Sequence, residues 1–241
     1  MATLSIISVP IGNSGDITLR AIETLRNATI ILCEDLKPAR RLLHDLKIEK
    51  ELLPLNEHTE KTASAEALEL LRAGKDLALI SDAGTPLVAD PGQHLVRLAI
   101  ANGMRVTAVP GASSILAALA VSGFESSRFN FAGFLPRERE ERKQAARKLA
   151  AREETIVLLE APYRLAQLLD DLVAGFGEAR EACVASELTT DQERVDRGTL
   201  LALRDQFRAR PFKGEFAVVI QGAQRPGAAR RVAARTPHRE R

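Results

Sequence analysis

The sequence predicts an α/β protein of two domains, with a mostly parallel sheet in the first half and a mixed sheet in the second. Short apolar runs alternate with amphipathic segments as far as Phe124, which is the pattern of strands joined by helical crossovers. Beyond that residue apolar runs also follow one another directly, so we expect antiparallel neighbours there. We place the domains at residues 1–125 and 126–222, and we expect the Arg-rich tail at 223–241 to be disordered.

In the first half, each predicted strand is a short apolar run, and each predicted helix carries helical periodicity with cap residues at its ends. Asp16 is a candidate N-cap, Pro38 fits a first helical turn, and Gly74 and Gly103 fit helix ends. The predicted strands are 4–9, 29–34, 76–80 and 105–109, and the predicted helices are 16–28, 38–46, 62–74, 92–103 and 112–123.

In the second half, the same criteria predict strands at 128–135, 155–160, 181–188, 193–200 and 214–222, and helices at 163–173 and 200–207. The highly charged segment 137–153 fits a solvated helix with i,i+4 ion pairs, and an arm that faces RNA is the alternative.

Composition favours a cytoplasmic protein without a membrane span. No run of about 18 apolar residues is present, and no basic region precedes the first apolar run. Cys33 and Cys183 lie in predicted strands without metal-ligand spacing, so we expect buried thiols in a reducing compartment and no metal site. The net charge of +2 depends on the tail, because the residues before 223 carry 28 basic and 31 acidic side chains. Charge alone therefore does not indicate a nucleic-acid partner.

Three turns rich in Pro and Gly follow predicted strands. They read VPIGNSGD after the first strand, SDAGTPLVADPG after Ile80, and VPGASS after the strand that ends at Val109. Ligands of open α/β sheets bind beyond the carboxyl ends of the strands, and stiff turns lower the entropic cost of binding. The absence of GxxxxGK[ST] excludes P-loop chemistry, and the absence of GxGxxG after the first strand argues against a Rossmann dinucleotide site. The turns predict a pocket for a polar ligand with few phosphates.

Several segments together carry a family resemblance. They are PIGNSGDITLRAIETL, CEDLKPARRLL, LNEHTE, ALISDAGTPLVADPGQHLVR, VPGASSILAALAVSGF, FAGFLPR, EAPYRL, SELT and GEFAVVIQG, in this order over residues 10–222. The chain resembles the tetrapyrrole methylase-like, class III S-adenosylmethionine-dependent methyltransferases, and within them the branch that methylates the 2′-hydroxyl of a cytidine in small-subunit (16S) ribosomal RNA. The resemblance implies the two-domain tetrapyrrole methylase-like fold, S-adenosylmethionine in a cleft between the domains, the small ribosomal subunit as partner, and a homodimer.

The resemblance also assigns cofactor contacts. Gly84 and Pro86 are expected to stiffen the central turn, while Asp82 and Thr85 meet the ligand. The full set is Pro10, Ile11, Asp82, Gly84, Thr85, Pro86, Ser113, Ser114, Leu188 and Glu215.

Methyl transfer to a hydroxyl needs an in-line nucleophile and is helped by a general base. The candidate catalytic carboxylates are Glu34, Asp35 and Asp16, of which Asp16 has capping as its alternative role. We read Glu34 and Asp35 as functional, because a carboxylate pair at the end of a strand has no evident capping role. The candidate substrate contacts are cationic, titratable or aromatic side chains: Arg20, Lys37, Arg40, His58, Tyr163 and Arg164.

Three departures from the family pattern affect the substrate side. Leu36 and Lys37 replace the usual Thr-Arg, residues 161–164 read APYR in place of SPHR, and only an Arg-rich tail follows the last strand. A methyltransferase of the same fold that acts on a small molecule, such as a tetrapyrrole precursor, or on a protein therefore stays open. So does a non-catalytic protein that binds S-adenosylmethionine.

Overall fold

The computed structural model describes residues 2–224 and divides into two compact units. The first unit comprises the residues up to Ala117 together with Leu188–Gln192, and the second comprises Ala118–Glu187 and the described residues from Glu193 onward. The chain thus passes from one unit to the other inside helix α5 (Ser114–Ser122), whereas the sequence placed the boundary after residue 125. A helix interior carries no Gly or Pro signal that could mark it. The tail predicted to be disordered lies, from residue 225, outside the described residues.

The sheet of the first unit is parallel throughout, as predicted. Its strand order is β3-β2-β4-β1-β5, so β1 lies between β4 and β5. The strands are β1 (Thr3–Ile7), β2 (Ile30–Cys33), β3 (Glu51–Pro54), β4 (Leu77–Ile80) and β5 (Arg105–Val109). β3 was not predicted, because this edge strand begins with exposed Glu51 and ends in Pro54.

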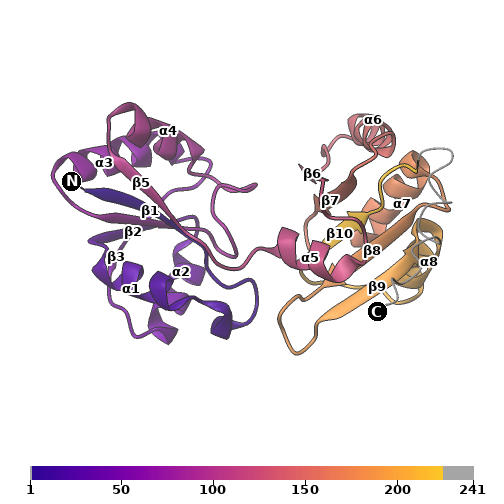
Figure 1. Cartoon of the computed structure of the whole chain (residues 1–241), viewed down its shortest axis with the longest axis horizontal. Coiled ribbons are helices and arrows are strands. Elements are labelled where there is room, and N and C mark those ends of the chain that lie inside the picture. Colours follow the sequence, from indigo (N-terminus) through magenta and orange to yellow (C-terminus); the bar gives the residue numbers. More distant parts are fainter. Residues whose placement is uncertain (1, 225–241) are drawn as a thin grey trace, which may run out of the picture. The chain divides into compact units, whose positions relative to one another are not determined.

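Helices cover both faces of this sheet, and Figure 1 shows one helical layer on each side of the strands. One face packs Ile7, Ile31 and Ile80 against α1 and α2, and the other packs Leu4 and Leu32 against α3 and α4. Burial on both faces explains why the strands read as continuous apolar runs. The helices are η1 (Ser14–Asp16), α1 (Leu19–Asn27), α2 (Leu36–Asp45), α3 (Glu60–Arg72) and α4 (Gln93–Ala101).

Two helix starts differ from the sequence interpretation. Thr18, and not Asp16, caps α1, because its hydroxyl accepts the N–H of Ala21 at 3.1 Å. Asp35 caps α2 by accepting the N–H of Lys37 at 2.9 Å, although we had assigned no capping role to this carboxylate. Asp16 is therefore exposed and caps no α-helix, whereas Asp35 is the N-cap of α2.

The second unit has the mixed sheet that the sequence predicted, in the order β6-β7-β10-β8-β9. β6 is parallel to β7, whereas β10 is antiparallel to β7 and β8, and β9 is antiparallel to β8. Three helices share one core with the sheet, in which Leu172 and Phe207 are buried. The elements are β6 (Phe129–Gly133), α6 (Arg139–Ala150), β7 (Thr155–Leu159), α7 (Leu165–Phe176), β8 (Glu181–Ser186), β9 (Arg194–Thr199), α8 (Leu200–Ala209) and β10 (Phe216–Ile220).

Candidate functional site

The three Pro- and Gly-rich turns converge at one edge of the first sheet. All its strands are parallel, so their carboxyl ends meet at the same edge, and the turns follow the neighbouring strands β4, β1 and β5. Val9 and Gly84 form an isolated bridge, with the N–H of Val9 2.9 Å from the Gly84 oxygen and the N–H of Gly84 3.1 Å from the Val9 oxygen. Two turns that lie far apart in the sequence are thus bonded backbone to backbone.

The hydroxyl of Thr85 joins the third turn to the other two. Its Oγ1 donates to the carbonyl oxygen of Ala112 at 3.0 Å and lies 3.0 Å from Oγ of Ser8. Because the single proton goes to Ala112, Ser8 is the donor in the second bond. The side chain of Thr85, which the resemblance assigned to the ligand, is thus bonded within the protein to Ser8 and Ala112.

Close backbone packing makes small residues necessary in these turns. A Cβ on Gly111 would lie 3.0 Å from Cβ of Ser8, and a Cβ on Gly84 would lie 3.2 Å from Ile11 in a backbone with φ of +77°. Pro10 and Pro86 restrict the backbone on either side. The turns are therefore rigid before any ligand arrives.

A segment from the far end of the chain packs on the first turn. Leu188–Gln192, the loop between β8 and β9, belongs to the first unit, where Asn13 donates its N–H to Oγ1 of Thr189 at 2.9 Å. Leu188 is buried, and its carbonyl oxygen would lie 2.7 Å from a Cβ on Gly12. The structure thus brings the predicted contact Leu188 to the turn that holds Pro10 and Ile11. Thr189 has φ of +68°, which is strained for a β-branched residue and is typical of functional loops.

Carboxylates gather beside these turns, where β2 and β4 end next to one another. Oδ1 of Asp82 accepts the N–H of Asp35 at 3.1 Å. Burial, followed by repulsion from Asp90, Asp82, Glu57 and Asp35, raises the pKa of Glu34 to about 7. Burial and the neighbouring charges therefore allow the candidate base Glu34 to accept a proton near neutral pH.

Asp90 is a member of this group that the sequence reading missed. Burial and, to a smaller extent, repulsion from Asp82 raise the pKa of Asp90 to about 6, and burial likewise raises the pKa of Asp82. Asp90 stands in the quoted turn SDAGTPLVADPG, but only the folded loop brings it back toward Glu34. Sequence spacing alone contains no signal for that return.

The predicted cationic contacts of the first unit lie in exposed positions. Arg20 is in the first turn of α1, and Lys37 and Arg40 are in the first half of α2. Within residues 2–224 none of these three forms an ion pair, so all remain available to phosphate groups. His58 follows β3, is exposed, and donates its backbone N–H to Oδ1 of Asn56 at 3.1 Å.

The remaining predicted contacts have local partners. Oγ of Ser113 accepts the N–H of Leu116 at 3.4 Å, and Ser114 is the first residue of α5. In the second unit, Glu215 donates its N–H to Oε1 of Glu187 at 2.8 Å, and burial, then repulsion from Glu187, raises its pKa. Tyr163 is exposed, and the guanidinium of Arg164 lies 3.5 Å from Oε1 of Glu160.

The two cysteines are buried, as predicted. Burial is the largest cause that raises the pKa of Cys33 and Cys183 to about 11, so both thiols stay protonated and unreactive. The described residues contain no cluster of three or more His, Cys, Asp or Glu side chains that could hold a metal ion. In the same part of the chain, no helix has the length and apolar character that a membrane span requires.

Comparison with known proteins identifies relatives over almost the whole chain. The family model "Tetrapyrrole (Corrin/Porphyrin) Methylases" matches residues 3–204. A protein of Xylella fastidiosa named Ribosomal RNA small subunit methyltransferase I is 46% identical over 230 residues, which cover 95% of this chain and 84% of that protein. A Thermotoga maritima protein of the same name is 40% identical over 93% of this chain and 100% of its own length.

Solved structures share the fold at low sequence identity. Diphthine synthase aligns with a TM-score of 0.72 at 17% identity, over 92% of this chain and 90% of that chain. Uroporphyrin-III C-methyl transferase from Thermus thermophilus, solved in complex with S-adenyl homocysteine, aligns with a TM-score of 0.62 at 18% identity, over 92% and 97% of the two chains.

Proposed function

Because the chain belongs to the tetrapyrrole (corrin/porphyrin) methylase family, and within it to the proteins named ribosomal RNA small subunit methyltransferase I, we propose that it methylates the 2′-hydroxyl of a cytidine in 16S ribosomal RNA. The chain is an S-adenosylmethionine-dependent methyltransferase, and the related enzyme solved with S-adenyl homocysteine supports this cofactor. The observation that carries the proposal is the convergence of three preorganised turns beside Glu34. The names of the relatives support ribosomal RNA as the substrate.

The residues present fit S-adenosylmethionine. The turns after β1, β4 and β5 bring backbone groups together without intervening side chains, since Gly84 and Gly111 leave no Cβ at the closest approaches. The carboxylates of Glu34, Asp82 and Asp90 give this edge a negative potential that favours a sulfonium cation. When bound, the cofactor supplies a methyl group whose bond to sulfur breaks as the bond to the attacking oxygen forms.

The chain contributes orientation and a proton acceptor. We assign Glu34 as the residue that takes the proton from the 2′-hydroxyl, because its pKa of about 7 matches the operating pH. Asp35 caps α2 and uses its N–H to hold Asp82, so its part is positional. Asp16 remains a candidate for contact with the attacking ribose, since it is exposed and caps no α-helix.

Basic and aromatic side chains are proposed to bind the RNA. Arg20, Lys37 and Arg40 are exposed and unpaired within the described chain, as phosphate contacts require. His58 adds an exposed imidazole to these candidate RNA contacts, and Arg164 adds a partly buried guanidinium. Removal of one phosphate contact is expected to weaken binding and to lower the salt dependence of the association constant.

We also propose that two copies of the chain associate, as the family resemblance implies. Leu19, which is 86% exposed, and Leu116, which is 58% exposed, are apolar side chains that such an association can cover. Light scattering after gel filtration tests this part. A monomer at all accessible concentrations would contradict it.

The deciding experiment incubates the protein with methyl-labelled S-adenosylmethionine and small ribosomal subunits from a strain that lacks the corresponding gene. We expect label in 16S RNA and its recovery as 2′-O-methylcytidine after digestion. Subunits from the parent strain, whose site is already methylated, are the matched control and should take up no label. If calorimetry shows binding of the donor but the undermethylated subunits stay unlabelled, the ribosomal substrate is wrong and a small molecule or a protein takes its place. If the donor does not bind, the chain is not a methyltransferase.

A further inference from the structure

Two loops of the second unit expose aromatic rings at the same edge of the sheet. β6 and β7 are parallel, with Gly133 opposite Leu158, so the loops that follow them begin side by side. Phe134 in the first loop is 52% exposed, and Tyr163 in the second is 72% exposed. The chain has only eight Phe and one Tyr, so two exposed rings at one edge are a concentration that packing does not explain.

Cationic side chains lie at the same edge. Arg137 ends the first loop and is exposed, and no carboxylate of residues 2–224 forms an ion pair with it. Lys213 is also exposed, and its neighbour Gly214 donates its N–H to the carbonyl oxygen of Pro162, which anchors this segment to the second loop at 3.3 Å. Within residues 2–224 neither Arg137 nor Lys213 forms an ion pair, and both lie on segments at the edge that carries the two exposed rings.

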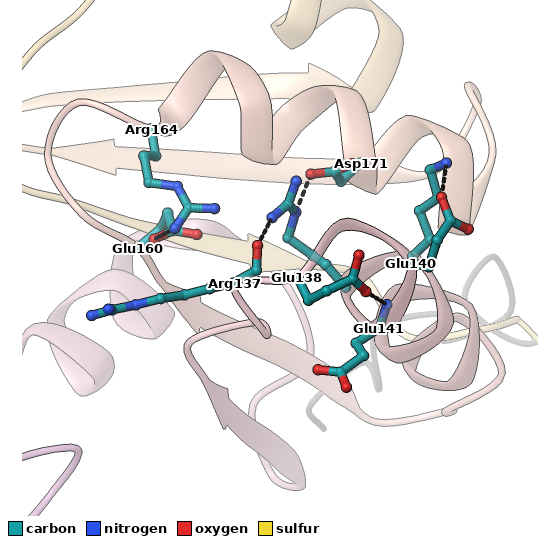
Figure 2. Close-up of polar contacts among 9 residues, drawn as sticks. Arg137, Glu138, Glu140, Glu141, Glu160, Arg164 and Asp171 are labelled. Atoms are coloured by element: carbon teal, nitrogen blue, oxygen red, sulfur yellow. Dashed lines mark hydrogen bonds and ion pairs between the residues drawn. The ribbon is translucent and has the colours of Figure 1, made fainter.

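Buried ion pairs hold both loops in place, as Figure 2 shows. Arg142 of helix α6, which is 2% exposed, pairs with Asp171 of α7 and donates Nη1–H to the carbonyl oxygen of Arg137 at 2.9 Å. In the second loop, the buried carboxylate of Glu160 accepts the N–H of Ala161 at 2.9 Å and pairs with Arg164. These contacts stiffen the backbone that presents the rings, which lowers the entropic cost of binding a partner.

The acidic groups at this edge make local backbone hydrogen bonds. Glu138 caps α6, and the N–H of Glu141, followed by that of Glu140, lowers the pKa of Glu138. Glu187 and Glu215 lie together where β8 ends and β10 begins, and Glu187 accepts the N–H of Glu215. Arg137 and Lys213 therefore supply cationic groups at this edge, beside carboxylates that are bonded to backbone N–H groups.

We propose that Phe134, Arg137, Tyr163 and Lys213 form an aromatic platform that binds an unpaired stretch of RNA. Unstacked bases lie on the two rings while Arg137 and Lys213 contact the phosphates on either side, which is how single strands are bound without sequence preference. A duplex keeps its base faces stacked and offers only its backbone, so the platform discriminates against double-stranded RNA. This proposal deepens the proposed function and rests on it, since it specifies an unpaired region as the substrate.

The test measures the fluorescence anisotropy of a labelled oligocytidine, alone and annealed to its complement. Replacement of Phe134 or Tyr163 by Ala is expected to weaken binding of the single strand by about 5-fold to about 150-fold, and to leave duplex binding unchanged. Phe129→Ala is the matched control, because Phe129 is 39% exposed but lies at the amino end of β6, away from the platform, and it should retain wild-type affinity. Arg137→Ala should lower the slope of log K against log salt by about 0.7.

Other results would overturn the platform. Equal affinities of Phe134→Ala, Tyr163→Ala and Phe129→Ala for the single strand refute it, as does tighter binding of the duplex. The labelled-donor assay on ribosomal subunits separates the two proposals. If wild-type protein methylates the subunits and the platform variants do so with unchanged KM, the platform is wrong and the methyltransferase assignment stands. If wild-type protein methylates no subunits, the assignment itself is wrong.

Discussion

Replacement of Thr85 by Val tests whether one hydroxyl holds the donor turns together. The change is nearly isosteric, but it removes the bond to the carbonyl oxygen of Ala112 and the bond to Ser8, each 3.0 Å long. A typical internal hydrogen bond contributes about 1 kcal/mol, and a partner left unsatisfied in a partly buried site adds to the loss. We therefore expect a decrease of about 1–3 kcal/mol in the free energy of unfolding, measured by urea denaturation.

The same substitution should also weaken binding of the methyl donor. If the turns lose the register in which they meet the ligand, about 1–2 kcal/mol of preorganisation is lost, and the Kd for S-adenosylmethionine rises by about 5-fold to about 30-fold. Isothermal titration calorimetry measures this change. Thr85→Ser keeps the hydroxyl and is the matched control, with a Kd expected within about 3-fold of wild type. Thr85→Val with the affinity and stability of Thr85→Ser would refute the claim that this hydroxyl organises the site.

Three further substitutions test the carboxylates and the buried pair. Asp82→Asn keeps the acceptor for the N–H of Asp35 but removes a charge that burial disfavours, so calorimetry should show weaker donor binding at pH 8 while urea stability does not fall; equal affinity would contradict an electrostatic role. Glu34→Gln should abolish the rise of kcat/KM through about pH 7. The folded state holds the proton of Glu34 more tightly than the unfolded state, so wild-type stability falls between pH 4.5 and about 7, and the variant should gain relative stability in that window. Arg142→Met should lower the free energy of unfolding, measured in urea, by about 3–5 kcal/mol, because it leaves the buried carboxylate of Asp171 without its partner. Adding Asp171→Leu should recover part of that loss. A double variant as unstable as the single variant would refute the pairing.

Much of the first unit could be predicted because its signals are local. The apolar runs that form β1, β2, β4 and β5 are short and bounded by Gly, Pro or charged residues, and the helices between them carry apolar residues at helical spacing. β3 escaped prediction, because an edge strand can expose Glu51 and end in Pro54 without losing its pairing with β2. Local patterns therefore identify strands that form uninterrupted apolar runs, and they miss a short edge strand such as β3, which Glu51 and Pro54 bound.

The roles of individual polar residues were harder to predict from the sequence. The capping of α1 by Thr18 and of α2 by Asp35 depends on where each helix begins, which periodicity locates only to within a few residues. Arg142 stands in a run of charged residues that reads as a solvated face, and only the packing of α6 on α7 shows that it is buried beside Asp171. The elevated pKa of Glu34 likewise depends on Asp90, which the fold brings near.

By itself, the sequence determined the α/β class, the stiff turns rich in Pro and Gly, and the kinds of side chain available beyond the strands, because propensity, capping and turn chemistry act over a few residues. The tertiary structure decided that β1 lies between β4 and β5, that Thr85 joins Ser8 to Ala112, and that the loop containing Leu188 returns to the first turn. Strand order and loop contacts depend on side chains distant in the sequence, whose packing is decided only when the sheet is assembled.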